Sequence, residues 1–387
     1  MYKRILCFGL PALFIIFMIY RFVRPLSIFV VTEYFERPIQ VGTIPPGLES
    51  LSAKECGRCH REIYEEWSGS MHAHAWTDPY FQVDFVFDGS LQICLNCHIP
   101  LENQQENLVL GFRDREKLDP ILKPNPNFDP LLQKEGVTCS VCHVANGVIL
   151  GPYNNAQAPH PVRKDPRFTD GNGVCLRCHM VLGQRWDTFY RIPPCGTFAE
   201  IRETGSHKAD CIGCHMPKDV KETIGVGDTG HSLHLWKGGH DPETIRKALR
   251  FELREEESIH KNRKRYSLTL TNTGADHFLP TGTPDRHLTV TFDLLDSNKK
   301  LLTEKTFVLK RTIMWRPFII DLWDTRLPRD EPRNFDMEFR TDSNPPPAFL
   351  KIAVTYHLLD EKRRTRIGYQ NKEPISYQLY ERELEVR

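Results

Sequence analysis

The spacing of apolar and polar residues changes near residue 244 of this 387-residue chain. Beyond that point, short runs alternate apolar and polar side chains, as in Leu288-Thr-Val-Thr-Phe-Asp-Leu294. A period of two is typical of β-strands that bury one face. Turn residues separate these runs, so residues 244–387 are predicted to form an antiparallel β-sandwich domain. The expected strands are residues 249–253, 266–271, 288–294, 305–310, 335–339, 350–356 and 375–379.

The preceding region, residues 51–243, shows little alternation and many breaks. Stretches rich in proline, glycine and asparagine at 120–126 and 151–155 predict loops between short helices. Ser52-Ala-Lys-Glu55 has the spacing of a capping box, so a helix is expected from there to about Trp67. The chain is therefore predicted to be α+β, with a loop-rich, mainly helical domain before the sandwich.

Residues 1–31 have the features of an export signal or a membrane anchor. Two basic residues precede an apolar run at 5–20, and a second apolar run follows at 26–31. As a helix, the first run covers about 24 Å of the roughly 30 Å hydrocarbon core of a bilayer. If the two arginines between the runs extend toward the headgroups, the apolar segment can continue to residue 31. We expect an uncleaved single-pass anchor, with a cleaved export signal as the alternative, and a proline-containing linker at 32–50.

The pattern Cys-x-x-Cys-His occurs five times between residues 56 and 215. It is the attachment pattern of haem c, in which two thiols form thioethers with the porphyrin and the histidine binds the iron. Zinc sites and disulfides also use cysteine pairs, but neither requires a histidine after each pair. We therefore predict five covalently attached haems c. The attachment cysteines are Cys56, Cys59, Cys94, Cys97, Cys139, Cys142, Cys175, Cys178, Cys211 and Cys214, and the iron-ligating motif histidines are His60, His98, His143, His179 and His215.

Additional histidines decide whether the irons are open to substrate. Seven lie in the motif-bearing region outside the motifs, which is enough to give every iron a second histidine ligand. With so little protein per motif, we also expect the haems to pack against one another. The predicted second ligands are His72, His160, His207, His231 and His234; further candidates are His74, His240 and His277. Cys195 belongs to no motif and is interpreted as a small buried residue, with a ligand or redox-active thiol as the alternative.

The charge balance and the haem chemistry restrict the setting of the protein. Lys and Arg number 51 against 50 Asp and Glu, so nothing indicates nucleic acid as a partner. Haem c is attached outside the cytoplasm. We therefore expect a protein of the cytoplasmic membrane whose bulk faces the periplasm or the cell exterior.

Two stretches resemble a known group of proteins. Cys56-Gly-Arg-Cys-His-Arg-Glu-Ile-Tyr-Glu-Glu-Trp67, followed by Ser70-Met-His-Ala-His-Ala75, resembles multihaem cytochromes related to the tetrahaem acceptor of hydroxylamine oxidoreductase. Asp210-Cys-Ile-Gly-Cys-His-Met-Pro217 is similar to their closing motif. The resemblance implies that His72 is a second iron ligand and favours His74 less. The fifth motif, the N-terminal segment and the C-terminal domain depart from that group. In the C-terminal domain, the arrangement His-x-x-Pro-Thr-Gly beginning at residue 277 resembles a sandwich domain appended to other multihaem cytochromes.

These features favour an electron carrier over an enzyme that converts a substrate. It would relay electrons between a membrane donor and an extracytoplasmic redox partner. One alternative is a multihaem oxidoreductase that acts on a small nitrogen or sulfur compound at one five-coordinate haem. Another is a quinol dehydrogenase, in which the donor is quinol or a membrane oxidoreductase. All five motifs end in histidine, without the lysine found in pentahaem nitrite reductases.

Overall fold

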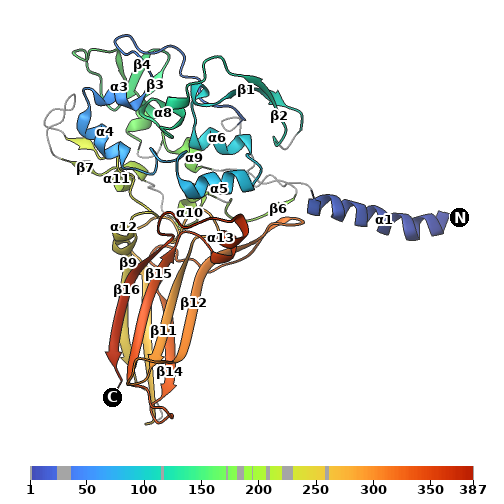
Figure 1. The fold of residues 1–387 in the computed structure, drawn as a ribbon, viewed down its shortest axis with the longest axis vertical. Coiled ribbons are helices and arrows are strands. Elements are labelled where there is room, and N and C mark those ends of the chain that lie inside the picture. The colour runs from blue at the N-terminus through green and yellow to red at the C-terminus, as the bar shows by residue number, and fades with distance from the viewer. Residues whose placement is uncertain are drawn as a thin grey trace.

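The computed structural model of the chain describes residues 2–23, 36–114, 117–170, 173–180, 187–193, 195–205, 210–219, 230–257 and 261–386. These residues form three parts in Figure 1. Helix α1 (Tyr2–Val23) projects sideways, a region of short helices and hairpins carries the motifs, and a long pair of β-sheets extends from that region.

The motif-bearing region consists of short helices, small sheets and loops, as predicted. Its helices are α3 (Ala53–Gly57), α4 (Arg61–Ser68), α5 (Pro79–Phe87), α6 (Gln92–His98), η1 (Glu102–Gln104), α7 (Pro130–Gln133), α8 (Cys139–His143), η2 (Pro166–Phe168), α9 (Leu176–His179), α10 (Thr197–Glu203), α11 (Cys211–His215) and α12 (Pro242–Lys247). Its strands are β1 (Asn107–Phe112), β2 (Pro120–Pro124), β3 (Val144–Ala145), β4 (Val148–Gly151), β5 (Val162–Lys164), β6 (Thr188–Phe189), β7 (Lys218–Asp219) and β8 (His231–Ser232). Most of these strands pair locally, β1 with β2, β4 with β3 and β5, and β7 with β8.

The first helix of this region differs from its sequence prediction. The single helix expected from Ser52 to Trp67 is divided into α3 and α4, and His60 precedes α4 in a non-helical conformation. Ser52 does cap α3, but the expected Glu55 is not its acidic partner. The Ala53 N–H instead donates to Glu135 at 2.8 Å, from a segment 82 residues away. The local pattern thus identified the cap but could not identify a partner so distant in the sequence.

The C-terminal region is an antiparallel sandwich, which confirms the predicted fold class. Its strands are β9 (Leu249–Glu256), β10 (Arg263–Asn272), β11 (His287–Leu295), β12 (Leu301–Met314), β13 (Ile319–Asp324), β14 (Arg333–Arg340), β15 (Phe349–His357) and β16 (Ser376–Glu385). One sheet has the order β14-β10-β9, and the other has the order β16-β15-β11-β12-β13 with β6 at its end. All seven expected strands are present. Strand β13 and helix α13 (Glu361–Ile367) were not predicted, because neither segment has a period of two.

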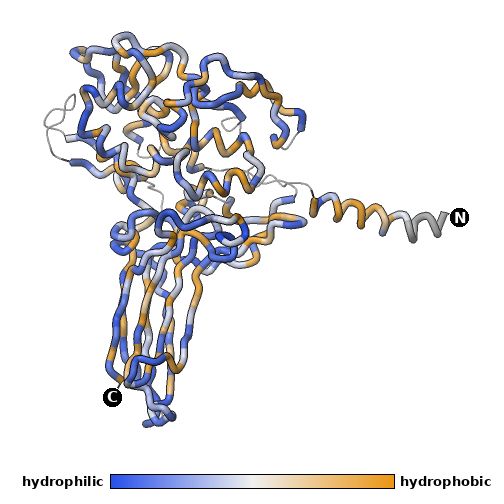
Figure 2. The backbone as a smooth tube through the Cα atoms, in the orientation of Figure 1, coloured by the Kyte–Doolittle hydropathy of each residue, from blue (hydrophilic) through white to orange (hydrophobic). Residues whose placement is uncertain are grey.

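The sandwich core lies between the two sheets. In the pairing of β11 with β15, Val290 faces Val354 and Phe292 faces Ile352, and all four side chains are fully buried. Alternate positions of both strands are partly exposed, as the sequence pattern predicts. Figure 2 shows apolar and polar residues along the strands, in contrast with the mostly apolar α1.

Strand pairing, hydrogen bonds and ion pairs join the sandwich to the motif-bearing region. Strand β6 pairs in parallel with β13, so the motif-bearing region adds a short strand to a sandwich sheet. Arg326 of the sandwich forms a buried ion pair with Glu200 of α10 at 2.5 Å. The same guanidinium binds both carboxylate oxygens of Asp324, at 2.9 and 2.7 Å. These contacts fix the near end of the sandwich against the motifs.

Helix α1 is held at its C-terminal end. Arg21 forms a buried ion pair with Asp187 at 2.8 Å and donates to the Pro317 carbonyl at 3.0 Å. Arg316 donates to the Phe22 carbonyl at 2.9 Å. In the described part of the chain, no helix is both long and apolar enough to cross a membrane. The expected anchor and linker include residues 24–35, which lie outside the described residues.

Candidate haem-binding site

One cavity of about 2860 Å³ runs through the motif-bearing region and reaches the near end of the sandwich. All ten motif cysteines and all five motif histidines line it. A pocket for one small molecule typically has a volume of about 300–1,000 Å³. The cavity is therefore large enough for several such ligands, and the five motifs share one interior.

Each motif forms one short helical turn at the wall of this cavity. Helices α8 and α11 consist of the motif residues alone, and α6 ends at its motif histidine. In the first motif, the His60 N–H donates to the Cys56 carbonyl at 2.9 Å, the bond of an α-helical turn. Positions i, i+3 and i+4 of a helix share a face. Both thiols and the imidazole of a motif therefore point to the same side.

Backbone carbonyls orient three of the motif imidazoles. Nδ1 lies 2.6 Å from the Ala75 carbonyl in His98, 2.7 Å from Leu150 in His143 and 2.9 Å from Lys237 in His215. A carbonyl can only accept, so each Nδ1 carries the proton. This leaves the Nε2 lone pair available, which is the usual arrangement of a metal-binding histidine.

Three motif histidines face a second histidine at one characteristic spacing. The ring centroids are 6.3 Å apart for His179 and His72. They are 6.2 Å apart for His143 and His234, and 6.4 Å apart for His215 and His277. Two metal–imidazole bonds of about 2 Å, with each ring centre about 1 Å behind its nitrogen, place axial rings roughly 6 Å apart. All three pairs therefore have the spacing of two ligands on one iron.

Burial keeps the second histidines of these pairs neutral. It lowers the pKa of His72 and of His234 to about 3, and that of His277 to about 4. The nearby motif histidines His179, His143 and His215 lower these pKa values further. The neutral imidazole is the form that binds a metal.

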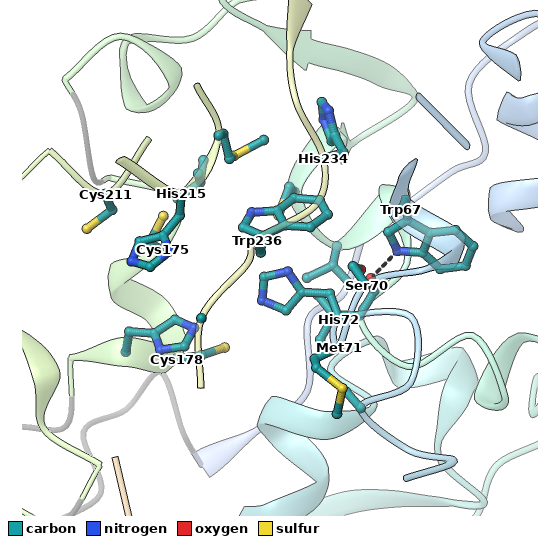
Figure 3. A pocket seen from close by; sticks show the side chains of 18 of the residues that line it. Trp67, Ser70, Met71, His72, Cys175, Cys178, Cys211, His215, His234 and Trp236 are labelled. Atoms are coloured by element: carbon teal, nitrogen blue, oxygen red, sulfur yellow. Dashed lines mark hydrogen bonds between the residues drawn. The ribbon is translucent and has the colours of Figure 1, made fainter. Parts of the chain in front are cut away.

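Trp236 supports two of these histidines. Its ring lies edge-on to His72, with the centroids 4.5 Å apart, and contacts His234 at 5.2 Å. Figure 3 shows His72 and Trp236 in the middle of the cavity, between the cysteines of the fourth and fifth motifs and Trp67. The Trp67 indole N–H donates to the Val137 carbonyl at 2.9 Å. Sequence reasoning gave no role to Trp236, although its position two residues after His234 was a usable signal.

The attachment motifs lie next to one another in a branched series. The third and fourth motifs adjoin through Cys142 and Cys178. Cys59 and Cys214, in the first and fifth motifs, are exposed, whereas the other motif thiols are partly covered. Thiols of different motifs also come within hydrogen-bonding reach of each other: Cys56 and Cys139, Cys97 and Cys178, Cys175 and Cys211. The fourth motif thus adjoins the second, third and fifth, and the first motif adjoins the third.

His231 has a different environment from its predicted ligand role. Its Nε2 lies 2.9 Å from the Glu66 carboxylate, and both side chains are largely buried. The other oxygen of Glu66 accepts from the His234 N–H at 2.8 Å. Through Glu66, His231 helps to position His234, and its role as an iron ligand stays a prediction.

The remaining candidate histidines are placed as follows. His160 lines the cavity, and its buried Nδ1 has no hydrogen-bond partner among the described residues. His240 also lines the cavity, and burial lowers its pKa to about 4. His74 is exposed and is not part of the cavity wall, in agreement with the preference for His72. His207 lies outside the described residues.

The surroundings of His98, the histidine of the second motif, differ from those of the three paired motif histidines. The ring of His98 stacks on Phe81, with the centroids 3.5 Å apart. In the described part of the chain, no second imidazole faces His98 at the spacing of the other pairs. Burial raises the pKa of Asp285 to about 6. The charged or polar residues that line this part of the cavity include Tyr80, Asp84, His240, Asp285, Arg286 and Arg363.

Cys195 packs beside the same motif. It contacts the apolar cluster of Ile93, Cys94 and Cys97. Burial raises the pKa of its thiol, which disfavours the reactive thiolate. This environment agrees with its interpretation as a small buried residue.

Comparisons with known proteins point to one class. Residues 55–119 match the family model described as cytochrome c554 and c-prime. The fold is similar to the crystal structure of a penta-heme cytochrome c552 from Thermochromatium tepidum, with a TM-score of 0.66 and 20% identity over 87% of this chain and 98% of that chain. Both comparisons agree with the class of multihaem cytochromes c that the five motifs predict. A structural genomics target, SoR45, reaches a TM-score of only 0.17 at 14% identity, over 35% of this chain and 85% of that chain. No curated protein sequence matches the chain.

The residues of the cavity wall fit haem c. A shared cavity lined by all the motifs, thiols and imidazoles on one face of each turn, and neutral imidazoles in facing pairs are what covalent, doubly ligated haem requires. Among the described residues, the cysteines form no disulfide, and no cluster of three or more His, Cys, Asp or Glu could hold a metal ion. The zinc and disulfide alternatives for the motifs therefore gain no support.

Proposed function

We propose that this cytochrome carries five covalently bound haems c and relays electrons between redox partners outside the cytoplasm. The observation that carries this proposal is that three motif histidines each face a second histidine. The ring centroids of each pair are 6.2 to 6.4 Å apart. An iron held by two protein ligands has no free position for a substrate. Haem supplies one-electron redox chemistry, and the chain tunes it through axial ligands and burial.

The second ligands are assigned from the three pairs. His234 serves the third motif, His72 the fourth and His277 the fifth. His277 comes from the sandwich, so this domain would complete a site in the motif-bearing region. The second ligands of the first and second motifs are to be sought among His160, His207 and His240.

The order of the sites suggests where electrons enter and leave. The first and fifth motifs have the exposed thiols, and the contacts between motifs connect them through the third and fourth. The second motif is a branch on the fourth. We propose that partners dock near Cys59 and Cys214, because electron transfer requires close approach to a haem edge.

Intact-protein mass spectrometry and electron paramagnetic resonance test the proposal together. The mature protein should carry the mass of five haems, and the oxidised irons of the third, fourth and fifth sites should be low-spin. His277→Ala should convert one iron to high-spin, whereas the matched surface variant His74→Ala should leave the spectrum unchanged. Equal spectra for both variants would remove the assignment of His277.

A donor in the cytoplasmic membrane is part of the proposal. It is supported by the apolar N-terminal segment and by the export that haem c attachment requires. Reduction of the haems by quinol, in membranes that contain the cytochrome, would identify quinol as the direct donor. If reduction requires a further membrane oxidoreductase, the donor is that protein.

A second candidate function is an oxidoreductase that acts on a small nitrogen or sulfur compound at the second site. It is favoured by the Phe81 ring against His98 and by the charged residues of the nearby cavity wall. Arginine, histidine and aspartate side chains of this kind can bind an anion and move protons. Nitrite, hydroxylamine or sulfite should then shift the spectrum of one iron. An unchanged spectrum with all three would leave electron transfer as the function.

A further inference from the structure

A cluster of exposed aromatic and apolar side chains lies where α1 meets the sandwich. We call residues 315–323, from the end of β12 through β13, together with Phe189 of β6, the aromatic arm. Trp323 is 57% exposed and Phe189 56%, and Leu322 and Trp315 are also exposed. Large exposed apolar side chains gathered on one projection indicate a surface that contacts a protein, a membrane or a ligand. Figure 1 shows this arm extending beside the base of α1.

A β-bulge exposes two neighbouring residues of the arm. In the pairing of β12 with β13, Thr312 faces Trp323 and Ile313 faces Asp321, so Leu322 is the extra residue. Successive residues of a regular strand point to opposite faces, but a bulge interrupts this alternation. Leu322 and Trp323 are consequently both exposed. The exposure results from the local backbone arrangement and does not reflect one poorly packed side chain.

Over residues 9–23, whose side chains the structure describes, helix α1 is apolar on every side apart from the buried Arg21. A helix of this kind is stable when an apolar medium surrounds it, and a soluble helix normally has a polar face. The exposed apolar residues of α1 cover all directions around its axis: Leu10, Leu13, Phe14, Ile15, Ile16, Phe17, Ile19, Tyr20, Phe22 and Val23. The helix projects from the body of the protein, which does not cover it (Figure 2).

An ion pair, a ring contact and a hydrogen bond connect the arm and its surroundings to α1. The Arg21–Asp187 ion pair is buried, with side-chain exposures of 3% and 6%. The Arg21 guanidinium lies 5.5 Å from the centre of the Phe318 ring. Arg316 of the arm donates to the backbone of α1. The medium that surrounds the base of α1 must therefore also contact the arm.

We propose that the aromatic arm rests in the headgroup region of a lipid bilayer beside α1, an inference that rests on the membrane association included in the proposed function. Tryptophan is enriched at membrane–water interfaces because its ring is apolar and its N–H remains hydrated. The exposed Arg316 between Trp315 and the arm's apolar residues can meet anionic headgroups. A bilayer surrounds a helix on all sides, which a groove on a partner protein does not. The contact would orient the haem sites relative to a membrane donor.

Photo-crosslinking of the full, haem-loaded cytochrome in vesicles of phosphatidylethanolamine and phosphatidylglycerol tests this placement. Benzoylphenylalanine replaces Trp323 in one protein and Leu301, an exposed residue at the distant start of β12, in the control. Mass spectrometry should find lipid adducts at position 323 and none at 301. Adducts at both positions, no lipid adduct at 323, or an adduct with a second protein chain would overturn the proposal. A mature N-terminus beyond residue 23 would also overturn it.

A second measurement uses substitution. The variant F189S/W315S/W323S removes the three exposed aromatic rings of the arm while leaving Phe318, α1 and the haem motifs unchanged. Its haem spectrum and vesicle association should be retained, but residues 315–323 should exchange amide hydrogens at least about tenfold faster than in the native protein in vesicles. The same variant in the absence of vesicles serves as the reference. Equal exchange in native and variant proteins in vesicles would contradict the proposed contact.

Discussion

Replacing Arg326 by methionine tests how the sandwich is held against the motif-bearing region. Arg326 binds Glu200 at 2.5 Å, the Pro280 carbonyl at 3.1 Å and both oxygens of Asp324. Glu200 is only 1% exposed, so the variant leaves a buried carboxylate without its guanidinium. Breaking a buried ion pair by removing one partner costs about 3–5 kcal/mol. We expect a loss of this size in the free energy of unfolding.

The matched variant Glu200→Gln should lower the free energy of unfolding by a smaller amount than Arg326→Met. Arg326 then keeps its bidentate contact with Asp324, and only one charge-assisted hydrogen bond is weakened, worth about 1.5–3 kcal/mol. Chemical denaturation, followed by far-UV circular dichroism with the haem spectrum recorded in parallel, measures both variants. A smaller loss for Arg326→Met than for Glu200→Gln would refute the reasoning.

The pH dependence of Arg326→Met provides a second check. Burial raises the pKa of Glu200 above its ordinary value, although Arg326 lowers it. Without Arg326, the pKa in the folded protein should rise further above that of the unfolded chain. A carboxyl with a raised pKa destabilises the fold increasingly as pH rises. The loss in the free energy of unfolding caused by Arg326→Met should therefore be larger at pH 8 than at pH 5. A loss that is independent of pH would contradict the role given to Glu200.

Three further predictions follow from the cavity wall. His72→Ala should convert one iron to high-spin in the paramagnetic resonance spectrum, and His74→Ala should not. Cys195→Ser should leave the haem content found by mass spectrometry unchanged, because Cys195 is a buried packing residue; loss of a haem would show another role. Burial raises the pKa of Asp285 to about 6, so Asp285→Asn should stabilise the protein by about 3 kcal/mol at pH 7.5. This gain should disappear near pH 4, and thermal unfolding at both pH values measures it.

The fold was predictable where the sequence has a regular period. The alternation of 288–294 and 350–356 specified two central strands whose alternate residues are buried, and the structure confirms them. Strand β13 lacks this period, because its apolar residues come in adjacent pairs around a bulge. The N-terminus of α3 is capped in part by Glu135, a contact distant in the sequence. Local patterns do not contain such information.

The residues that line the site were easier to predict than their arrangement in space. Spacing alone predicts the attachment cysteines and motif histidines, and the structure places all of them on the wall of one cavity. The pairing of His277 with His215 joins residues from different domains, and a single sequence does not reveal it. The contact of His231 with Glu66 likewise depends on tertiary structure, so His231 looked as suitable a ligand as His234. The choice between them required the positions of their rings.

Quantitative electron paramagnetic resonance of the fully oxidised, full-length cytochrome tests the central claim most directly. The account predicts that at least three of five irons are low-spin with two histidine ligands, and that His234→Ala removes one of these signals. A majority of high-spin irons, or a spectrum insensitive to the substitutions at positions 72, 234 and 277, would contradict the proposal that this protein is an electron carrier.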